Sequence, residues 1–136
     1  MAGVPKAGGA GPDGRVRVVS AWVVLVALHS YAVGVFLLFL TEWGARFGGF
    51  GEVSPLFFAR QAGIFHFVIA TAYLVEWFVH RGVIVMLLAK ASAVVFLLAV
   101  WALGVDAWSV PFSAAGDALL GTATLVLWRR SVRPSG

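Results

Sequence analysis

The chain has 136 residues, of which 61% are hydrophobic and 12% are charged, with a formal net charge of +4. A soluble domain has about 25% charged residues, so this composition indicates a membrane protein rather than a soluble one. The chain has no cysteine, which excludes disulfides, thiolate metal sites and CxxC redox centres. The positive charge does not indicate nucleic acid, because the basic residues flank apolar segments instead of forming one patch.

The first predicted element is a tail over residues 1–16. Residues 1–14 are mostly Gly, Ala and Pro, and such a segment has too few large apolar side chains to pack, so we expect it to be disordered. A single domain over residues 17–130 follows, and residues 131–136 form a second tail. The domain contains four apolar blocks, which are Val18–Leu40, Leu56–Val79, Val83–Leu103 and Phe112–Trp128. Since a membrane-spanning helix needs about 20 apolar residues, the sequence predicts an all-α, antiparallel bundle of four transmembrane helices.

The basic residues predict how this bundle sits in the membrane. Seven of them fall on the side of the two termini and of the turn between the second and third blocks, namely Lys6, Arg15, Arg17, Arg81, Arg129, Arg130 and Arg133. The opposite side has Arg46, with Arg60 just inside the membrane. All six tryptophans lie near block ends, where the membrane interface favours them. Because basic loops stay in the cytoplasm, we expect cytoplasmic termini and a multi-pass protein of the inner (plasma) membrane.

The connections between the blocks predict the local structure at the helix ends. Thr41–Ser54 is rich in glycine, which predicts a flexible loop on the outer side. Ser54 is expected to cap the second helix and Pro55 to open it, and Pro111 has the same expected role at the fourth helix. The turn His80–Gly82 is short, so we expect the second and third helices to be antiparallel neighbours.

Two of the predicted helices carry small residues along one face, which is the face that packs against other helices in a membrane. The stripe on the second helix consists of Ala59, Gly63, His66, Ala70, Tyr73 and Trp77. The stripe on the fourth consists of Ala114, Asp117, Gly121, Thr124 and Trp128. His66 and Asp117 are therefore expected to point into the bundle.

Charged residues inside the helices need partners, because an unpaired charge there costs about 2 kcal/mol or more. Arg60 and Asp117 each lie ~8 Å below the outer surface at 1.5 Å per residue, which predicts an ion pair between them. The alternative is that Arg60 extends to the outer headgroups. Lys90 lies ~10 Å from the inner surface. It is expected to pair with Glu76 across the short turn, or else to turn inward and hold an anionic or carbonyl ligand.

His29 and His66 are both predicted ~17 Å deep, near the middle of the membrane. Two imidazoles at one depth match the axial ligands of a b-type haem, and they also suit a proton relay or a quinone carbonyl. A structural role is the remaining alternative. The face of His29 is ambiguous, because Ala27, Ser30 and Gly34 lie to one side of it. Apart from these two histidines we identify no metal ligand, and no catalytic residue.

Three short features carry a resemblance to a known family. The segment ARQAG (59–63) opens the second predicted helix, Lys90 lies inside the third, and GDALLG (116–121) lies in the fourth. With these features the chain from Ala21 to Trp128 resembles the DoxX-like small four-helix integral membrane proteins. The resemblance implies a four-helix fold with a polar interior. Some of its members are associated with redox or quinone-linked membrane complexes, but it implies no catalytic residues.

The leading functional hypothesis is an accessory or ligand-binding membrane protein whose interior holds a small hydrophobic ligand, such as a quinone or a lipid. The residues expected to line that interior are Arg60, His66, Lys90 and Asp117. One alternative is an electron-transfer subunit with haem b between His29 and His66, and another is a membrane enzyme that acts on a lipid-like substrate. The expected partners are the lipid bilayer, a hydrophobic small molecule and a larger membrane complex, without nucleic acid.

Overall fold

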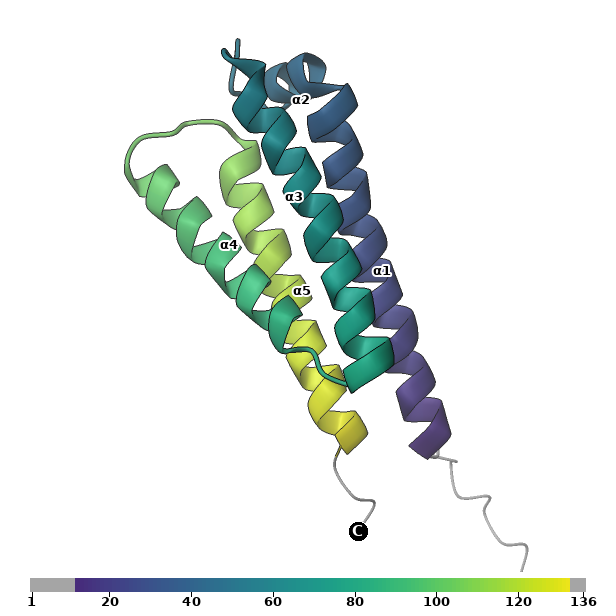
Figure 1. Ribbon diagram of the computed structural model, residues 1–136. Helices are drawn as coiled ribbons and strands as arrows, with labels where there is room; N and C mark the ends of the chain where they lie inside the picture. The colour runs from purple at the N-terminus through teal and green to yellow at the C-terminus, as the bar shows by residue number, and fades with distance from the viewer. Residues whose placement is uncertain (1–11, 133–136) are drawn as a thin grey trace, which may run out of the picture.

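The computed structural model describes residues 12–132, and every regular element within them is a helix (Figure 1). The elements in chain order are α1 (Pro12–Phe39), α2 (Thr41–Gly48), α3 (Leu56–Val75), the π-helical turn η1 (Glu76–His80), α4 (Ile84–Ala102) and α5 (Ser109–Val132). Residues 12–16, which were expected in the disordered tail, are the first turn of α1. Residues 131 and 132 likewise extend α5. The other residues of the two predicted tails lie outside the described range.

Four helical segments are long and apolar enough to cross a membrane, as the sequence predicted. They are Asp13–Phe39, Leu56–His80, Ile84–Ala102 and Ser109–Val132. The predicted all-α class is therefore confirmed. The fourth segment begins three residues earlier than expected, so Pro111 lies inside the first turn of α5 instead of opening it. A proline fits there, because the first N–H groups of a helix have no partner within the helix.

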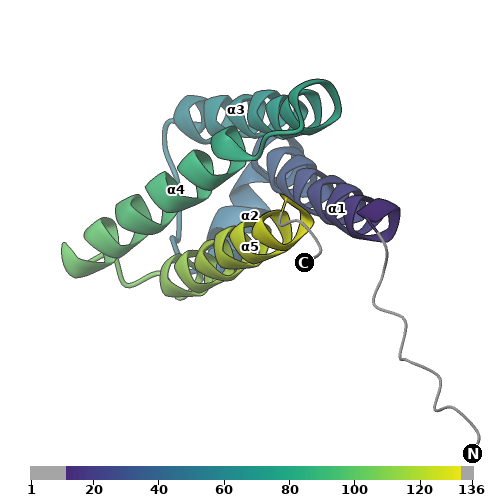
Figure 2. The ribbon, with the colours of Figure 1, turned by 90° about the horizontal axis from the view of Figure 1, so that it is seen from below.

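The long helices form two packed pairs, with both ends of the described chain at the same end of the molecule (Figure 1). Helix α3 packs along α1 and α4 packs along α5, while α1 also contacts α5. Above the turn at residues 81–83, α4 diverges from α3 (Figures 1 and 2). The expectation that these two helices are neighbours therefore holds only near their connection. In its most apolar stretch 11% of α4 is buried, against 28% of α1, so α4 is the most peripheral helix.

Glycines explain why α1 pairs with α3. A methyl group added at Gly63 would lie 2.9 Å from the carbonyl oxygen of Gly34. One added at Gly34 would lie 2.9 Å from the ring of Phe67. The two backbones therefore approach to a distance that only glycine permits, and this close approach supplies the van der Waals contact that drives helix association in lipid.

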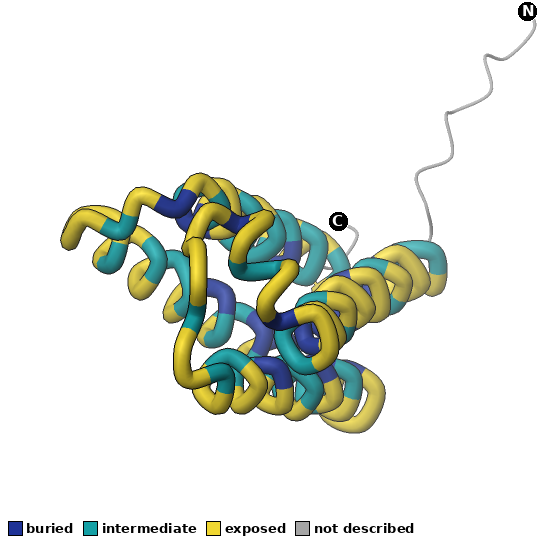
Figure 3. The backbone as a smooth tube through the Cα atoms, turned by 90° about the horizontal axis from the view of Figure 1, so that it is seen from above, coloured by how far each residue is buried: buried dark blue, intermediate teal, exposed yellow. Residues whose placement is uncertain are grey.

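The buried residues lie where the helices face one another, and the exposed residues lie on the outside of the molecule (Figure 3). Because the exposed side chains include large apolar residues on every long helix, the outer surface is suited to lipid contact. Two tryptophans, Trp22 and Trp77, turn their rings toward neighbouring helices. The indole nitrogen of Trp77 donates to Ser20 Oγ at 2.9 Å, and that of Trp22 donates to Thr124 Oγ1 at 2.9 Å.

Helix α2 corrects the expectation of a flexible loop over Thr41–Ser54. It begins where the Thr41 hydroxyl donates to the carbonyl of Leu37 at 2.6 Å. It ends at Gly49, whose left-handed backbone (φ 90°) lets its N–H reach the carbonyl of Arg46. The glycines that suggested a loop thus include the residue that terminates a helix. At the next connection Ser54 makes no capping hydrogen bond, and Pro55 occupies the cap position before Leu56.

Replacing Gly63 with valine should separate α1 from α3. The added side chain collides with backbone atoms, which cannot rotate away, so we expect a loss of about 1–3 kcal/mol in stability. Thermal unfolding of the purified protein in mild detergent measures this loss. Gly116→Ala is the matched control, because nothing lies within 4 Å of a methyl group at Gly116. Equal melting temperatures for the two variants would show that the close approach contributes nothing.

Candidate functional site

An ion pair lies between α4 and α5, inside the apolar segments. The Lys90 Nζ donates to the Asp117 Oδ1 at 2.6 Å. The two side chains are 8% and 17% exposed, so each charge has lost most of its contact with the surroundings. A charge-assisted hydrogen bond of this length is strong, and each group supplies the partner that the other needs in an apolar medium. Lys90 therefore turns inward, as in the second of its two predicted arrangements, and its partner here is the Asp117 carboxylate.

Neither of the two predicted ion pairs forms, because their members have other positions. Arg60 lies on an exposed face of α3 and makes no salt bridge among residues 12–132. Glu76 instead accepts hydrogen bonds from the backbone N–H groups of Ile84 at 2.7 Å and Val85 at 2.9 Å. Those N–H groups are unpaired within the helix, and the start of α4 favours a negative charge. The Arg60–Asp117 and Glu76–Lys90 pairs are both replaced by these contacts.

His66 points into the bundle, on the same face of α3 as the buried residues Gly63, Ala70 and Tyr73. Its Nδ1 is buried and has no hydrogen-bond partner. An unpaired buried polar atom costs about 1–3 kcal/mol, so this nitrogen still needs a hydrogen-bond partner. His66 lies within electrostatic range of Lys90 and Asp117.

His29 stands at the edge of this group. Its side chain is exposed on α1, yet it lies within electrostatic range of Lys90 and Asp117. Of the five predicted ligand-binding residues, Lys90 and Asp117 are in direct contact, His66 and His29 lie in the electrostatic surroundings of that pair, and Arg60 makes no salt bridge with it. We call His29, His66, Lys90 and Asp117 the polar cluster.

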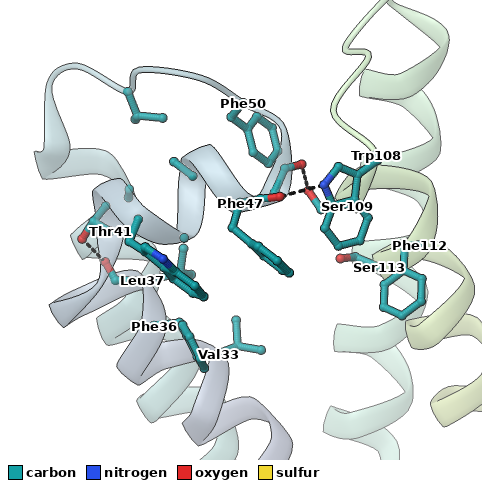
Figure 4. Close-up of a pocket in the computed structure, with 16 residues that line it drawn as sticks. Val33, Phe36, Leu37, Thr41, Phe47, Phe50, Trp108, Ser109, Phe112 and Ser113 are labelled. Atoms are coloured by element: carbon teal, nitrogen blue, oxygen red, sulfur yellow. Dashed lines mark hydrogen bonds between the residues drawn. The ribbon is translucent and has the colours of Figure 1, made fainter.

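A pocket of about 690 Å³ lies beneath α2, between α1, α3 and the start of α5 (Figure 4). The rings of Phe36, Phe47, Trp108 and Phe112 surround it. Its wall consists almost entirely of apolar side chains. Most of the polar groups there are already hydrogen-bonded within the protein. The Trp108 indole donates to the carbonyl of Phe47 at 2.7 Å, and the Ser109 hydroxyl donates to that of Gly48 at 2.7 Å.

Aromatic contacts hold α2 over this pocket. Trp43 stacks on Phe47 with ring centres 5.2 Å apart, and Phe47 meets the edge of Trp108 at 5.5 Å. On the other side of α2, Arg46 lies 3.9 Å from Glu52 in an exposed ion pair. The hydropathy pattern did not predict this pocket. The spacing of four residues between Trp43 and Phe47 marks one face of a helix, and it is the sequence feature from which α2 was predictable.

The pocket and the polar cluster lie along the same helix faces. Val33, which lines the pocket, follows His29 by four residues on α1, and Ser113 precedes Asp117 by four on α5. Residues four apart share a helix face and are separated by about 6 Å along the axis. The inner wall of the pocket is therefore one helical turn from the polar cluster on both helices.

The fold and the site define a class, which is an all-α protein with four candidate membrane spans and a charged group among them. Comparisons with family models, with curated proteins and with solved structures find no match for this chain. The DoxX-like resemblance stays a prediction.

Removing both members of the Lys90–Asp117 pair should destabilise the protein less than the sum of removing each one alone. Lys90→Met leaves the carboxylate without its partner, and Asp117→Leu does the same to the ammonium. We expect each single variant to lose about 3 kcal/mol or more. The double variant should lose clearly less than the sum of the two. Thermal unfolding in mild detergent measures all three.

The matched control for this cycle is the pair of Arg46→Ala and Glu52→Ala, whose side chains are 65% and 92% exposed. Their effects should add, because an exposed ion pair contributes little. Additive losses at Lys90 and Asp117 as well would mean that the two residues are not coupled.

Proposed function

We propose that this chain is an integral membrane protein that binds a small lipophilic molecule in the pocket beneath α2. In this arrangement the four candidate spans form an antiparallel bundle with both termini in the cytoplasm. The distribution of charge supports that orientation. Arg15 and Arg17 lie at the start of α1, Arg81 follows η1, and Arg129 and Arg130 end α5. These segments lie at one end of the molecule (Figure 1), and basic residues favour the cytoplasmic side.

The observation that carries the proposal is the alignment of the apolar pocket with the polar cluster. A pocket of about 690 Å³ lies within the range of 300–1,000 Å³ that is typical of small-molecule sites. Such sites combine an apolar wall with a few polar groups that orient the ligand. Here the wall lies beneath α2, His29 and Asp117 lie one turn deeper, and His66 lies two turns from Ala59, the α3 residue of the wall. The ligand body would occupy the pocket while its head points toward His66.

The polar cluster favours a ligand head without net charge. The Lys90 ammonium and the Asp117 carboxylate neutralise each other at 2.6 Å, so an added anion or cation would have to break that bond. His66 Nδ1 is buried and unpaired, and it can donate to a carbonyl or accept from a hydroxyl. A quinone or an uncharged lipid has this chemistry. Partners beyond the bilayer, including a larger membrane complex, stay predictions.

The haem alternative has less support from the packing of α1 and α3. A porphyrin between His29 and His66 requires the two helices that carry them to stand apart. One turn beyond His66, the backbones of Gly34 and Gly63 approach to direct contact. The enzyme alternative also has less support, because Lys90 and Asp117 are each engaged by the other.

Filling the pocket should release its ligand. Ser113 is an exposed residue of the pocket wall, so Ser113→Phe occupies the space that the ligand body needs. We expect the amount of co-purifying lipophilic compound to fall about tenfold or more, which corresponds to 1.4 kcal/mol or more of lost binding. Mass spectrometry of organic extracts, normalised to protein, measures the compound.

Ser92→Phe is the matched control, because Ser92 is exposed on α4 and lies outside the pocket wall. It should leave the ligand in place. His66→Leu tests the head of the ligand separately and should weaken retention without filling the pocket, whereas His80→Leu, in the exposed turn, should not. A compound retained equally by Ser113→Phe and Ser92→Phe would contradict binding in this pocket.

The orientation can be tested in intact cells. Cysteines introduced at Glu52, beside α2, and at His80, beside the opposite turn, create the only thiols of a chain that has no native cysteine. Both positions are exposed. A membrane-impermeant thiol reagent should label Glu52→Cys directly, and His80→Cys only after the membrane is permeabilised. The reverse result would invert the proposed topology.

A further inference from the structure

A second groove lies on the outer side of the α1–α3 pair, apart from the pocket beneath α2. Its volume is about 590 Å³, and the residues that line it are Leu38, Phe57, Arg60, Gln61, Ile64 and Phe65. None of them lines the first pocket. Four of the six are apolar, while Arg60 and Gln61 supply the polar groups. The groove thus combines one cation, one amide and an apolar wall.

Arg60 has no partner of its own within residues 12–132. It takes part in neither of the two salt bridges there, and it makes no hydrogen bond. Its residue is exposed. Arg60 also lies about 6 Å along α3 from Leu56, at the end of the molecule that carries α2 (Figure 1). If this end reaches the outer headgroups, the guanidinium lies near the level where lipid phosphates are found.

Farther from that level, the wall of the groove is apolar, as the hydrocarbon chain of a lipid requires. Ile64 follows Arg60 by four residues on the same face of α3, one turn farther into the apolar span. A molecule with an anionic head beside Arg60 would therefore place its hydrocarbon chain against Ile64 and Phe65. The exposed apolar side chains Phe57 and Phe65 would flank it.

We propose that this groove binds one glycerophospholipid through its phosphodiester group. The Arg60 guanidinium donates two hydrogen bonds to the phosphate oxygens, a geometry that suits arginine better than lysine. The Gln61 amide donates to the glycerol ester carbonyl, and an acyl chain follows the apolar wall. This site goes beyond the proposed function, because it shares no residue with the ligand pocket. The charge of Arg60, which has no partner within residues 12–132, is balanced by the phosphate.

The test compares two lipids that share the diacylglycerol part and differ in the phosphoglycerol head group. Delipidated protein in mild detergent is titrated with phosphatidylglycerol, and in parallel with diacylglycerol that has the same acyl chains, and native mass spectrometry counts the bound lipids. We expect the first phosphatidylglycerol to bind about tenfold more tightly than diacylglycerol, as charge-assisted bonds to a phosphate require. Arg60→Met should remove that preference, and Arg60→Lys should keep part of it.

Arg46→Met is the matched control, because it removes another arginine from the same end of the molecule but outside the groove. It should keep the preference. Where Arg60→Met fails to fold, Arg60→Gln provides the same loss of charge with a polar side chain. Equal affinity of the native protein for the two lipids would overturn the proposal, and so would equal losses in the Arg46 and Arg60 variants. A change of oligomeric state in Arg60→Met with unchanged lipid preference would also overturn it, by assigning the groove to a second chain.

This result is independent of the ligand pocket. Arg60→Met should retain the lipophilic compound that Ser113→Phe releases. Failure of the phospholipid site alone therefore leaves the pocket proposal standing, and the converse also holds.

Discussion

Lys90 and Asp117 form a 2.6 Å ion pair among apolar helices, and the position of α4 follows from it. In a membrane neither charge has water as an alternative partner, so the two helices that carry them must stay together. Gly121 permits this approach, since a methyl group there would lie 3.3 Å from the Lys90 Cβ. Helix α4 therefore packs along α5, although its short connection joins it to α3. The divergence of α3 and α4 in Figure 1 is the consequence.

The same rule governs the other polar groups of the interior. The indoles of Trp22 and Trp77 donate to hydroxyls on neighbouring helices, and the Thr124 hydroxyl donates to the carbonyl of Leu120 at 2.7 Å. Within residues 12–132, His66 Nδ1 is the one buried side-chain nitrogen or oxygen without a partner. Because buried polar groups are normally hydrogen-bonded, this exception makes His66 a candidate ligand-binding residue.

The two ends of the molecule differ in a way that suits the proposed activity. At the end with the termini, large side chains fill the interior, and the core includes Val19, Trp77 and Met86. At the other end, α2 covers an apolar pocket instead of a filled core. The ion pair and His66 lie between these two regions. A lipophilic molecule would thus find space at one end, polar groups at its inner limit and a close-packed barrier beyond them.

Hydropathy and charge alone were enough to predict the all-α class, the four long apolar helices and the inward faces of His66 and Asp117. These features depend on local periodicity, which a single sequence displays.

The partners of the charged residues required the three-dimensional structure. Depth along a helix suggested which residues could pair, but depth does not determine direction, and Arg60 lies on an exposed face of α3 without contact to Asp117. Glu76 does not pair with Lys90, because its carboxylate accepts hydrogen bonds from backbone N–H groups at the start of α4. The pocket beneath α2 was also beyond reach, since aromatic rings from two segments far apart in the chain, residues 36–50 and 108–112, line the space. Contacts between distant segments depend on which helices diverge. Helix packing determines that divergence, and the hydropathy pattern does not.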